Sequence, residues 1–455
     1  MHKARAGVNI PRYYPVTKIT VVEKLDSVRS ALENTRDGRG GERPGPRRQA
    51  RAGKAGSTPW RLERLLAQAL IRSTGDLPIR VQIGDGPSVS GRGPVVAAVR
   101  IRDVATFFKL LLYPDLNFGE AYLDGTLEVE GNLVAMLEAQ ARTRLHSSRK
   151  GVLSRFAAAA LHTTRSNTLA GSRANIHHHY DLGNDFYRLW LDEEMVYTCA
   201  YFAHKDMTLE AAQLAKLEHV CRKLRLRPGD RVVDAGCGWG ALALHAAARY
   251  GVRVRAFSIS REQIAYARER ARVLGVEHSV EFIEDDYRNI SGRFDAFVSI
   301  GMLEHVGRDH YRDFARVIDR GLTDTGRGLV HSIGQNQPLP FNPWIVKRIF
   351  PGACPPTLRE MVEIFEPLRC SILDVENLRP HYALTIEHWL QRFEAQSDHI
   401  AAMYDEPFVR AWRLYLCGSI AAFRAGTLQL FQVLFNRAGA NNAAWTRDHL
   451  YRDAD

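Results

Sequence analysis

Three glycines in one short segment carry the clearest chemical signal in this sequence. They stand at positions 236, 238 and 240 of VVDAGCGWG (232–240), where a run with the pattern of a strand gives way to a run with the pattern of a helix. Glycine lets the backbone turn tightly and approach a ligand closely, and doubly wound folds bind nucleotides where their strands end in this way. The third glycine comes too early for the dinucleotide fingerprint G-x-G-x-x-G. The segment therefore indicates a nucleotide-binding loop of some other type, with an ordinary glycine-rich turn as the alternative.

Alternating strand and helix patterns follow residue 173 and supply the elements that must position this loop. Strands are expected at 231–237, 253–259, 280–286, 294–301 and 328–334. Helices are expected at 209–224, 241–250, 261–275 and 309–322. This alternation predicts an α/β fold with a doubly wound, largely parallel sheet and helices on both of its faces. We assign this domain to residues 173–455.

The order D-x-G-x-G-x-G at 234–240 resembles motif I of the class I S-adenosylmethionine (SAM)-dependent methyltransferases, whose fold is Rossmann-like. The resemblance implies SAM as co-substrate, held in this loop by Asp234, Ala235, Gly236, Cys237, Gly238 and Gly240. The second expected strand departs from the pattern, because no carboxylate follows it before Glu262. Candidates to bind the cofactor there are Ser258, Ile259, Ser260 and Gln263. After the third strand, Asp286 and Tyr287 lie where the adenine would be met, with a solvated acidic turn as the alternative.

Ten short segments together resemble one family, the cyclopropane-fatty-acyl-phospholipid synthases and their mycolic-acid relatives. They are NIHHHYDLGNDFY (175–187), MVYTCAYF (195–202), AKLEHVCRKL (215–224), VVDAGCGWG (232–240), SISREQ (258–263), GMLEHVG (301–307), LVHSIG (329–334), IFPGACPP (349–356), HYALTIEHW (381–389) and LCGSIAAFRAGTLQLFQVLF (416–435). Residues 58–140 resemble the N-terminal domain of the longer, phospholipid-using members. The resemblance implies an enzyme that transfers the methyl(ene) carbon of SAM to the cis double bond of unsaturated acyl chains in membrane phospholipids, forming cyclopropane fatty acids.

This chemistry needs an apolar, dry site with one base. An isolated alkene is a poor nucleophile, so its attack on the sulfonium methyl leaves a cation in the acyl chain, and a proton must then be removed from the transferred methyl to close the ring. The family is understood to use a bound bicarbonate ion as this base. By resemblance, the bicarbonate ligands are Cys199, Glu304, His331, Tyr382 and the backbone of Ile333. Taken alone, His331 could be a satisfied core residue and Tyr382 a packing aromatic.

Several other residues receive roles by the same resemblance. Tyr197 and Thr198 are expected to contact the cofactor, and Tyr180 is expected to help close its pocket. Cys417 matches a cysteine sometimes assigned as catalytic, although a cysteine among Leu, Gly and Ile on a helix is usually a small core residue. The run of histidines at 177–179 does not predict a metal site, because neighbours in a run point in different directions and no partner has ligand spacing.

The segment FNPWIVKRIFPG (341–352) is expected to contribute to the wall of an acyl tunnel. Candidate wall residues are Phe341, Trp344, Ile345, Ile349 and Phe350. Aromatic side chains beside Lys347 and Arg348 would also suit a surface that meets lipid headgroups. Packing against the sheet is the alternative.

The N-terminal part of the chain divides into three regions. We expect a small α+β domain at 58–140, associated with lipid or with a dimer interface, with helices at 62–70 and 104–112, strands at 77–85 and 97–103, and short β segments at 118–131. Residues 141–172 are expected to be a basic linker that can include one helix, or an interfacial amphipathic segment. Residues 36–57 have almost no large apolar side chain to offset their chain entropy, so 1–57 is expected to be a disordered basic tail.

The positive charge of the chain is concentrated in that tail. The 455 residues include 62 Lys and Arg against 51 Asp and Glu, a formal charge of +11. Residues 1–57 hold thirteen basic and five acidic side chains, so +8 of the total lies there and the rest of the chain is almost neutral. The tail is therefore either a solubilising linker or a tether to anionic lipid headgroups.

Compartment and partners follow from the remaining composition. Six cysteines without a Cys-x-x-Cys pair, and the absence of a leader-like run after Met1, predict a reduced, cytoplasmic protein. No apolar run approaches the roughly 18 residues of a membrane-spanning helix, so membrane contact is expected to be peripheral, at the inner face of the membrane. Unsaturated phospholipid acyl chains are the expected partner, and a homodimer is possible.

Three alternatives remain open at this point. A nucleic-acid methyltransferase would also explain the positive charge, but the segment after the fourth strand reads GMLEHV rather than the N-P-P-aromatic type, and the basic excess lies in the tail. A lipid-binding protein with a relict fold is a second alternative. The third is the same methyl transfer with loss of a proton from the acyl chain, which gives methylene- or methyl-branched products.

Overall fold

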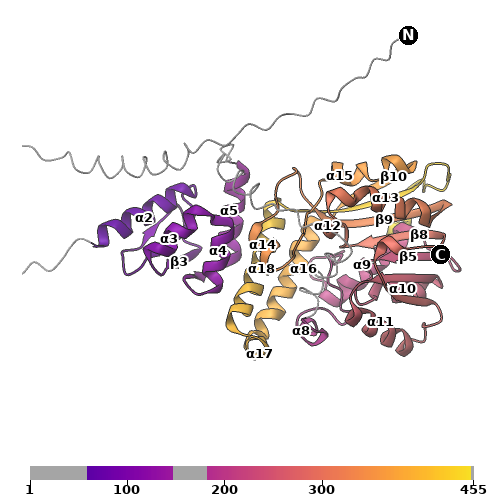
Figure 1. Ribbon diagram of the computed structural model, residues 1–455, viewed down its shortest axis with the longest axis horizontal. Coiled ribbons are helices and arrows are strands. Elements are labelled where there is room, and N and C mark those ends of the chain that lie inside the picture. The colour runs from indigo at the N-terminus through magenta and orange to yellow at the C-terminus, as the bar shows by residue number, and fades with distance from the viewer. Residues whose placement is uncertain (1–58, 147–181, 452–455) are drawn as a thin grey trace, which may run out of the picture.

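Two β-sheets organise the chain, with a group of helices between them (Figure 1). The structure is a computed structural model that describes residues 59–146 and 182–451. The expected tail at 1–57, most of the expected linker, the histidines at 177–179 and Tyr180 lie outside the described residues.

The smaller sheet has the strand order β2-β1-β3-β4 and belongs to an N-terminal α+β unit. Its elements are α2 (Pro59–Ser73), β1 (Ile79–Ile83), β2 (Val89–Ser90), β3 (Ala97–Ile101), α3 (Val104–Leu112), α4 (Pro114–Leu123), β4 (Leu127–Gly131) and α5 (Leu133–His146). β1 pairs with β3 in parallel, and the two other pairings are antiparallel. Alternate residues of β1 and β3 are buried, as expected for strands with one face against a core.

One expectation for this unit was wrong. Residues 118–123 form the end of helix α4 rather than a β segment, because Pro114 occupies the first turn, where its missing N–H costs no hydrogen bond, and starts a helix through these residues. Residues 141–146, the first of the expected linker, continue helix α5, which agrees with a linker that includes helix.

The larger sheet has seven strands in the order β10-β11-β9-β8-β5-β6-β7. Its strands are β5 (Arg231–Ala235), β6 (Arg253–Ser258), β7 (Val280–Glu284), β8 (Phe294–Ile300), β9 (Leu322–Gly334), β10 (Cys370–Asn377) and β11 (Gln429–Arg437). All pairings from β7 to β9 are parallel, and only β11 runs antiparallel to both of its neighbours. The expected doubly wound, Rossmann-like fold of a class I methyltransferase is confirmed.

Helices cover both faces of this sheet. They include α8 (Asn184–Arg188), α9 (Leu209–Leu224), α10 (Ala241–Tyr250), α11 (Arg261–Val273), α12 (Leu303–Val306), α13 (Tyr311–Gly321) and α15 (Leu358–Glu363), with the 3-10 turns η1 (Tyr287–Asn289), η2 (Arg308–His310), η3 (Glu366–Leu368) and η4 (Asp448–Leu450). Consecutive residues of β5 pack into hydrophobic cores on opposite faces of the sheet. Val232 packs with α9, α10 and α11, and Val233 packs with α13. Burial on both faces explains why the strands read as nearly continuous apolar runs.

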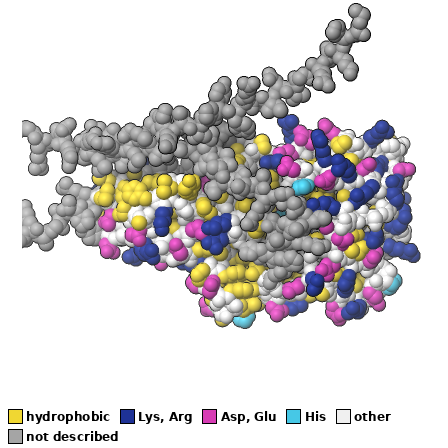
Figure 2. Space-filling view, viewed as in Figure 1, with side chains coloured by type: hydrophobic (Ala, Val, Ile, Leu, Met, Phe, Trp, Pro, Cys, Tyr) yellow, Lys and Arg dark blue, Asp and Glu magenta, His cyan; other side chains and the backbone are white. Residues whose placement is uncertain are grey.

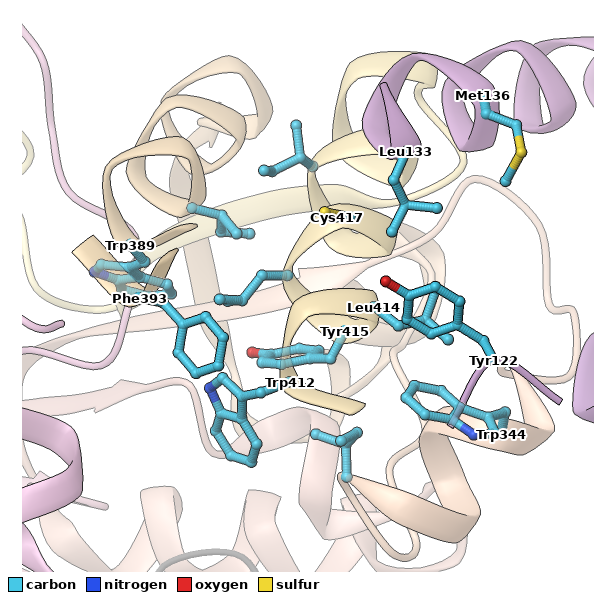
Figure 3. Close-up of a cluster of buried hydrophobic side chains, with 14 of the residues drawn as sticks. Tyr122, Leu133, Met136, Trp344, Trp389, Phe393, Trp412, Leu414, Tyr415 and Cys417 are labelled. Carbon is cyan, nitrogen blue, oxygen red and sulfur yellow. The ribbon is translucent and has the colours of Figure 1, made fainter. Parts of the chain in front are cut away.

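Helices α14 (Pro343–Arg348), α16 (Arg379–Ala395), α17 (Ser397–Met403) and α18 (Glu406–Ala425) lie between the two sheets (Figure 1). α18 packs on α16 and also on α4 and α5 of the N-terminal unit. One buried cluster therefore runs from Leu133 on α5 through Leu414 and Trp412 on α18 to Trp389 on α16 (Figure 3).

The segment expected to meet headgroups instead docks on the N-terminal unit. Trp344 is 3% exposed and lies over Gly119 of α4, where an added Cβ would overlap its indole ring. Lys347 and Arg348 pair with Glu120 on the same helix. The expectation of an exposed aromatic side chain was therefore wrong for Trp344, whereas Lys347 and Arg348 are half-exposed beside it.

Exposed apolar side chains gather on the N-terminal unit (Figure 2). Leu62 and Leu65 on α2 are exposed, as are Phe108, Leu111 and Leu112 on α3, and Leu112 is 67% exposed. A face of this kind is unusual for a surface that meets only water. No helix in the described part of the chain is both long and apolar enough to span a membrane.

Candidate active site

The glycine loop closes at the carboxyl end of β5, as the sequence predicts. Gly236, Gly238 and Gly240 all have positive φ, at +103°, +54° and +85°. An added Cβ at Gly240 would lie 2.7 Å from the Phe282 ring, so glycine here allows the start of α10 to pack closely on β7. The Gly236 N–H donates to Phe257 O at 3.0 Å, which ties the loop to β6. The conformation of the loop at the edge of the sheet therefore depends on its glycines.

The segment after β6 is organised around the start of helix α11. The Ser260 hydroxyl accepts a hydrogen bond from Gln263 N and caps the helix. Ser258 Oγ lies 3.0 Å from Gln263 Oε1, and its hydroxyl donates to that oxygen. Ile259 lies between the two serines and is half-buried. The structure therefore brings Ser258 and Gln263 together. The Ser260 hydroxyl instead caps helix α11.

Asp286 and Tyr287 follow β7, but both are engaged within the protein. The Asp286 carboxylate accepts two hydrogen bonds at 2.8 Å from the Arg288 guanidinium. The Tyr287 ring packs edge-on against Phe314, with ring centroids 5.7 Å apart, in the core below the sheet. Their expected contact with adenine stays a prediction.

Glu304 is buried on α12, directly after β8. Its carboxylate accepts a hydrogen bond from Ser332 Oγ at 2.9 Å and a longer one from Ile333 N at 3.4 Å. Burial raises its pKa to about 7, and these two donors oppose that shift. A carboxyl group poised near neutral pH in a buried site can accept or share a proton.

His331 lies on β9, two residues before Ile333, and is 1% exposed. The Gln432 amide nitrogen on β11 lies 3.0 Å from Nδ1. This contact between the Gln432 amide and the ring fixes the orientation of the imidazole. Burial lowers the pKa of His331 to about 3, and the positive charges of Lys216 and Lys223 lower it further. The ring is therefore neutral.

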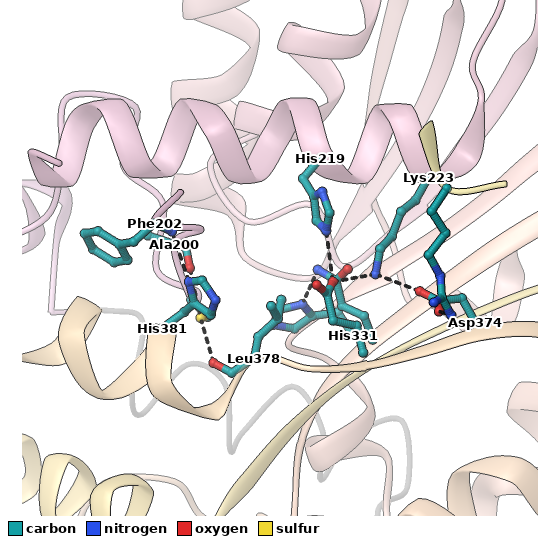
Figure 4. A network of polar contacts seen from close by, with 12 residues as sticks. Ala200, Phe202, His219, Lys223, His331, Asp374, Leu378 and His381 are labelled. Carbon is teal, nitrogen blue, oxygen red and sulfur yellow. Dashed lines mark hydrogen bonds and ion pairs between the residues drawn. The ribbon is translucent and has the colours of Figure 1, made fainter. Parts of the chain in front are cut away.

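Cys199 and Tyr382 both lie near the carbonyl of Leu378, just before the start of α16. The Leu378 carbonyl accepts the Tyr382 N–H at 3.2 Å and lies 3.9 Å from Cys199 Sγ (Figure 4). The Leu378 N–H in turn donates to Leu430 O on β11, and Leu430 is the register partner of Ile333. Burial raises the pKa of the Cys199 thiol well above its usual range, so the sulfur keeps its proton.

Backbone contacts bring these residues to one place. The Gly301 N–H, at the end of β8, donates to His331 O at 2.9 Å, and Met302 packs on Gly236 of the loop. The glycine loop, Glu304, His331 and the start of α16 thus meet at the carboxyl edge of β5, β8 and β9. Thiol, imidazole, amide and phenol groups can all donate to a small oxyanion, and Glu304 offers an acceptor. This donor set fits a bicarbonate ion.

Aromatic rings form the apolar surroundings of this edge. Tyr197 Oη lies 2.9 Å from Tyr415 Oη, and the Tyr197 ring packs against Trp389 at 5.3 Å. Phe350, just after α14, packs on Tyr415 at 5.4 Å and on His305 at 5.6 Å. Burial lowers the pKa of His305 to about 4, so this ring is also neutral. Such a setting excludes water, as cation chemistry on a hydrocarbon requires.

Two cysteines lie apart from the donor set. Cys417 is on α18 in the cluster shared with the N-terminal unit, beside Leu133 (Figure 3). Burial raises its pKa to about 12, which makes it a small core residue rather than a nucleophile. Cys237 is half-buried in the glycine loop, where its N–H donates to Phe257 O at 2.9 Å. Within residues 59–146 and 182–451, no three His, Cys, Asp or Glu side chains are placed to hold a metal ion.

Sequence reasoning missed two residues on α9 that donate hydrogen bonds to Thr198, in the middle of the Tyr197–Cys199 segment. Gln213 Nε2 donates to Thr198 O at 2.9 Å, and Lys216 Nζ donates to Thr198 Oγ1 at 3.1 Å. Both side chains are buried, and their helical spacing from Leu209 and Ala212 places them on the apolar face of the helix. Polar residues on that face were the signal that could have found them.

Comparison with known proteins agrees with this geometry. Residues 168–433 match the family model described as mycolic acid cyclopropane synthetase. The cyclopropane-fatty-acyl-phospholipid synthase of Escherichia coli K12 is 39% identical over 360 residues, which are 78% of this chain and 91% of the relative. The tuberculostearic acid methyltransferase UfaA1 of Mycobacterium tuberculosis is 31% identical, over 82% of this chain and 91% of the relative.

Solved structures agree as well. The mycolic acid cyclopropane synthase CmaA1, complexed with SAH and CTAB, superposes with a TM-score of 0.56 at 32% identity, over 58% of this chain and 98% of that one. The family match covers more than half of the chain, and it includes the glycine loop and the whole donor set. This protein therefore belongs to the mycolic acid cyclopropane synthetase family of SAM-dependent methyltransferases.

Proposed function

We propose that this protein transfers the methyl(ene) carbon of SAM to the cis double bond of unsaturated acyl chains in membrane phospholipids, forming cyclopropane fatty acids. One observation carries the proposal: backbone contacts and the bond from Ile333 N–H to Glu304 bring Glu304, His331 and the glycine loop to the same edge of the sheet. The sheet alone is common to many methyltransferases, whereas this donor set beside the loop suits a reaction that needs a held base.

The protein groups of the site would hold the base and exclude water. A bicarbonate ion bound by Cys199, His331, Tyr382 and the Ile333 N–H would supply the base that takes a proton from the transferred methyl. Neutral His331 would donate to this ion without adding a cation beside the sulfonium. Glu304 would accept from the ion and orient it. The neutral thiol of Cys199 acts as a donor rather than as a nucleophile.

Phospholipid, rather than a free acid or nucleic acid, is the substrate that the N-terminal unit supports. Its exposed Leu62, Leu65, Phe108, Leu111 and Leu112 give the protein an apolar face for a lipid surface. The relative named as a phospholipid synthase is matched over 91% of its length. We place the protein at the inner face of the membrane as a peripheral enzyme, with a homodimer as one possible assembly.

Methylene- or methyl-branched products are the second candidate. The similarity to a tuberculostearic acid methyltransferase favours this outcome as an alternative fate of the same cation. Loss of the proton from the transferred methyl gives the ring, whereas loss from the neighbouring chain carbon gives a methylene branch.

The experiment uses the purified full chain with SAM and vesicles of monounsaturated phospholipid. We expect mass spectrometry to find that monounsaturated acyl chains have become heavier by one CH2 group. We also expect this product to take up no H2 under mild catalytic hydrogenation. Uptake of H2 by the product would identify the methylene branch instead. Unchanged lipid together with methylation of added RNA would overturn the proposal.

Glu304→Gln tests the site itself. We expect a loss of about a hundredfold or more in turnover, the usual contribution of a positioned acid or base. Glu363→Gln makes the same change at a surface ion pair and serves as the matched control. Equal turnover in both variants would exclude the proposed role of Glu304.

A further inference from the structure

Helix α9 carries two buried lysines that are paired in different ways. Lys216 and Lys223 stand seven residues apart on one face of the helix, and each is 2% exposed. A buried ammonium is costly unless partners compensate for its lost water. Lys223 has two carboxylate partners on β10, Glu376 at 2.7 Å and Asp374 at 3.4 Å (Figure 4). Lys223 therefore has the surroundings of a structural ion pair.

Lys216 instead donates to a neutral hydroxyl, Thr198 Oγ1 at 3.1 Å. Its positive charge acts on two buried carboxyl groups from other elements, Asp192 before the segment and Asp234 at the end of β5. Burial raises the pKa of Asp192 to about 6 and that of Asp234 to about 7, and the charge of Lys216 opposes both shifts. Lys216 thus interacts electrostatically with one carboxyl group on β5 and one before the segment at 197–199, while burial lowers its own pKa to about 8.

The hydrogen bond fixes the orientation of the Thr198 side chain. With Oγ1 held by Lys216, the Thr198 methyl packs on Gly301, where an added Cβ would lie 3.0 Å away. Gln213, one turn earlier on α9, holds the Thr198 carbonyl at 2.9 Å. Tyr197 and Thr198 are the expected cofactor contacts, and Cys199 is the expected anion donor.

We propose that Lys216 is a positioning residue that holds Tyr197, Thr198 and Cys199 against the carboxyl edge of the sheet through the Thr198 hydroxyl, and that SAM binding depends on this contact. The inference rests on the proposed function, because it assigns the cofactor site to SAM. Lys216 itself stays behind the segment and acts through Thr198.

The test measures binding of S-adenosylhomocysteine to the full chain by calorimetry. Lys216→Met should weaken binding by about tenfold or more, the affinity equivalent of one hydrogen bond to a charged group. Lys223→Met is the matched control on the same helix, and it should lower the melting temperature while leaving the dissociation constant within about twofold of wild type. Equal binding by wild type and Lys216→Met would overturn the inference.

A second pair of variants keeps the test open if Lys216→Met fails to fold. Thr198→Val removes the acceptor and should weaken binding, whereas Thr198→Ser keeps the hydroxyl and should restore it. The double variant Lys216→Met/Thr198→Val should bind no more weakly than the poorer single variant, because both act through one contact. Additive losses, or equal binding by Thr198→Val and Thr198→Ser, would refute the role. Failure of the wild-type protein to bind would instead count against the proposed function.

Discussion

Glu120, on helix α4 of the N-terminal unit, accepts hydrogen bonds from Arg348 of α14 at 2.6 Å and 2.8 Å. Lys347 donates to the same carboxylate at 2.9 Å. These contacts fix α14 against α4. Phe350, two residues after Arg348, packs on Tyr415 and His305 beside the candidate active site. The N-terminal unit is thereby connected to Phe350, an expected wall residue of the acyl tunnel.

Glu120→Gln should therefore impair turnover of phospholipid without affecting cofactor binding. The arginine and lysine are half-exposed, so we expect a loss of only about 1 kcal/mol in the contact and a few-fold fall in kcat/KM for vesicles. The affinity for S-adenosylhomocysteine should equal that of wild type. Glu128→Gln changes an exposed glutamate of the same unit and provides the control. A parallel loss of cofactor affinity in Glu120→Gln would point to general destabilisation.

The sequence predicts the local parts of this architecture and misses the long-range contacts. The loop at 236–240 and the ends of β6, β7 and β8 follow from glycine spacing and apolar runs, which are local properties of the chain. The docking of Trp344 on Gly119 joins two segments that no short pattern relates. The same is true of the contact between Lys216 and Thr198. Side chains of this kind show their role only after the fold brings their partners together.

Glu304 should also make stability depend on pH in a predictable direction. Its pKa is raised by burial from the ordinary value near 4.5 to about 7, so folding disfavours the ionised form. The contribution of the neutral carboxyl to stability is complete below about pH 4.5 and is lost as the pH rises through 7. Glu304→Gln cannot ionise, so it should gain stability relative to wild type between pH 5 and pH 8, by on the order of 2 to 3 kcal/mol.

Urea unfolding of both proteins at the two pH values measures this difference. Asp192, Asp234 and Lys216 are present in both proteins, so their own titration cancels to first order in the comparison. A constant difference between the two proteins across this range would mean that Glu304 is already ionised at pH 5.

Cys417→Ala should leave catalysis intact. The thiol lies in the cluster between α18 and α5, away from the donor set, and its replacement leaves only a small cavity. We expect turnover within about twofold of wild type and a loss of stability of about 1 kcal/mol. Cys199→Ala, a matched change at a fully buried cysteine in the donor set, should reduce turnover much more strongly. Loss of turnover in Cys417→Ala with an unchanged melting temperature would restore a catalytic role for this thiol.

Membrane binding should have two separable contributions, one electrostatic and one apolar. Deleting residues 1–57 removes +8 of the formal charge of +11, so binding to anionic vesicles should weaken at low salt and the difference should fade as salt rises. Leu112→Glu places a charge on the exposed face of α3 and should weaken binding to neutral and anionic vesicles alike, at every salt concentration.

Vesicle co-sedimentation across a salt series separates the electrostatic contribution from the apolar one. The control is Val273→Glu, which places a charge at an exposed apolar residue of α11. Because cofactor binding needs neither the tail nor α3, its affinity should stay at the wild-type value in all three variants. If the deletion leaves the salt dependence unchanged, the tail is only a spacer and the apolar face alone accounts for binding.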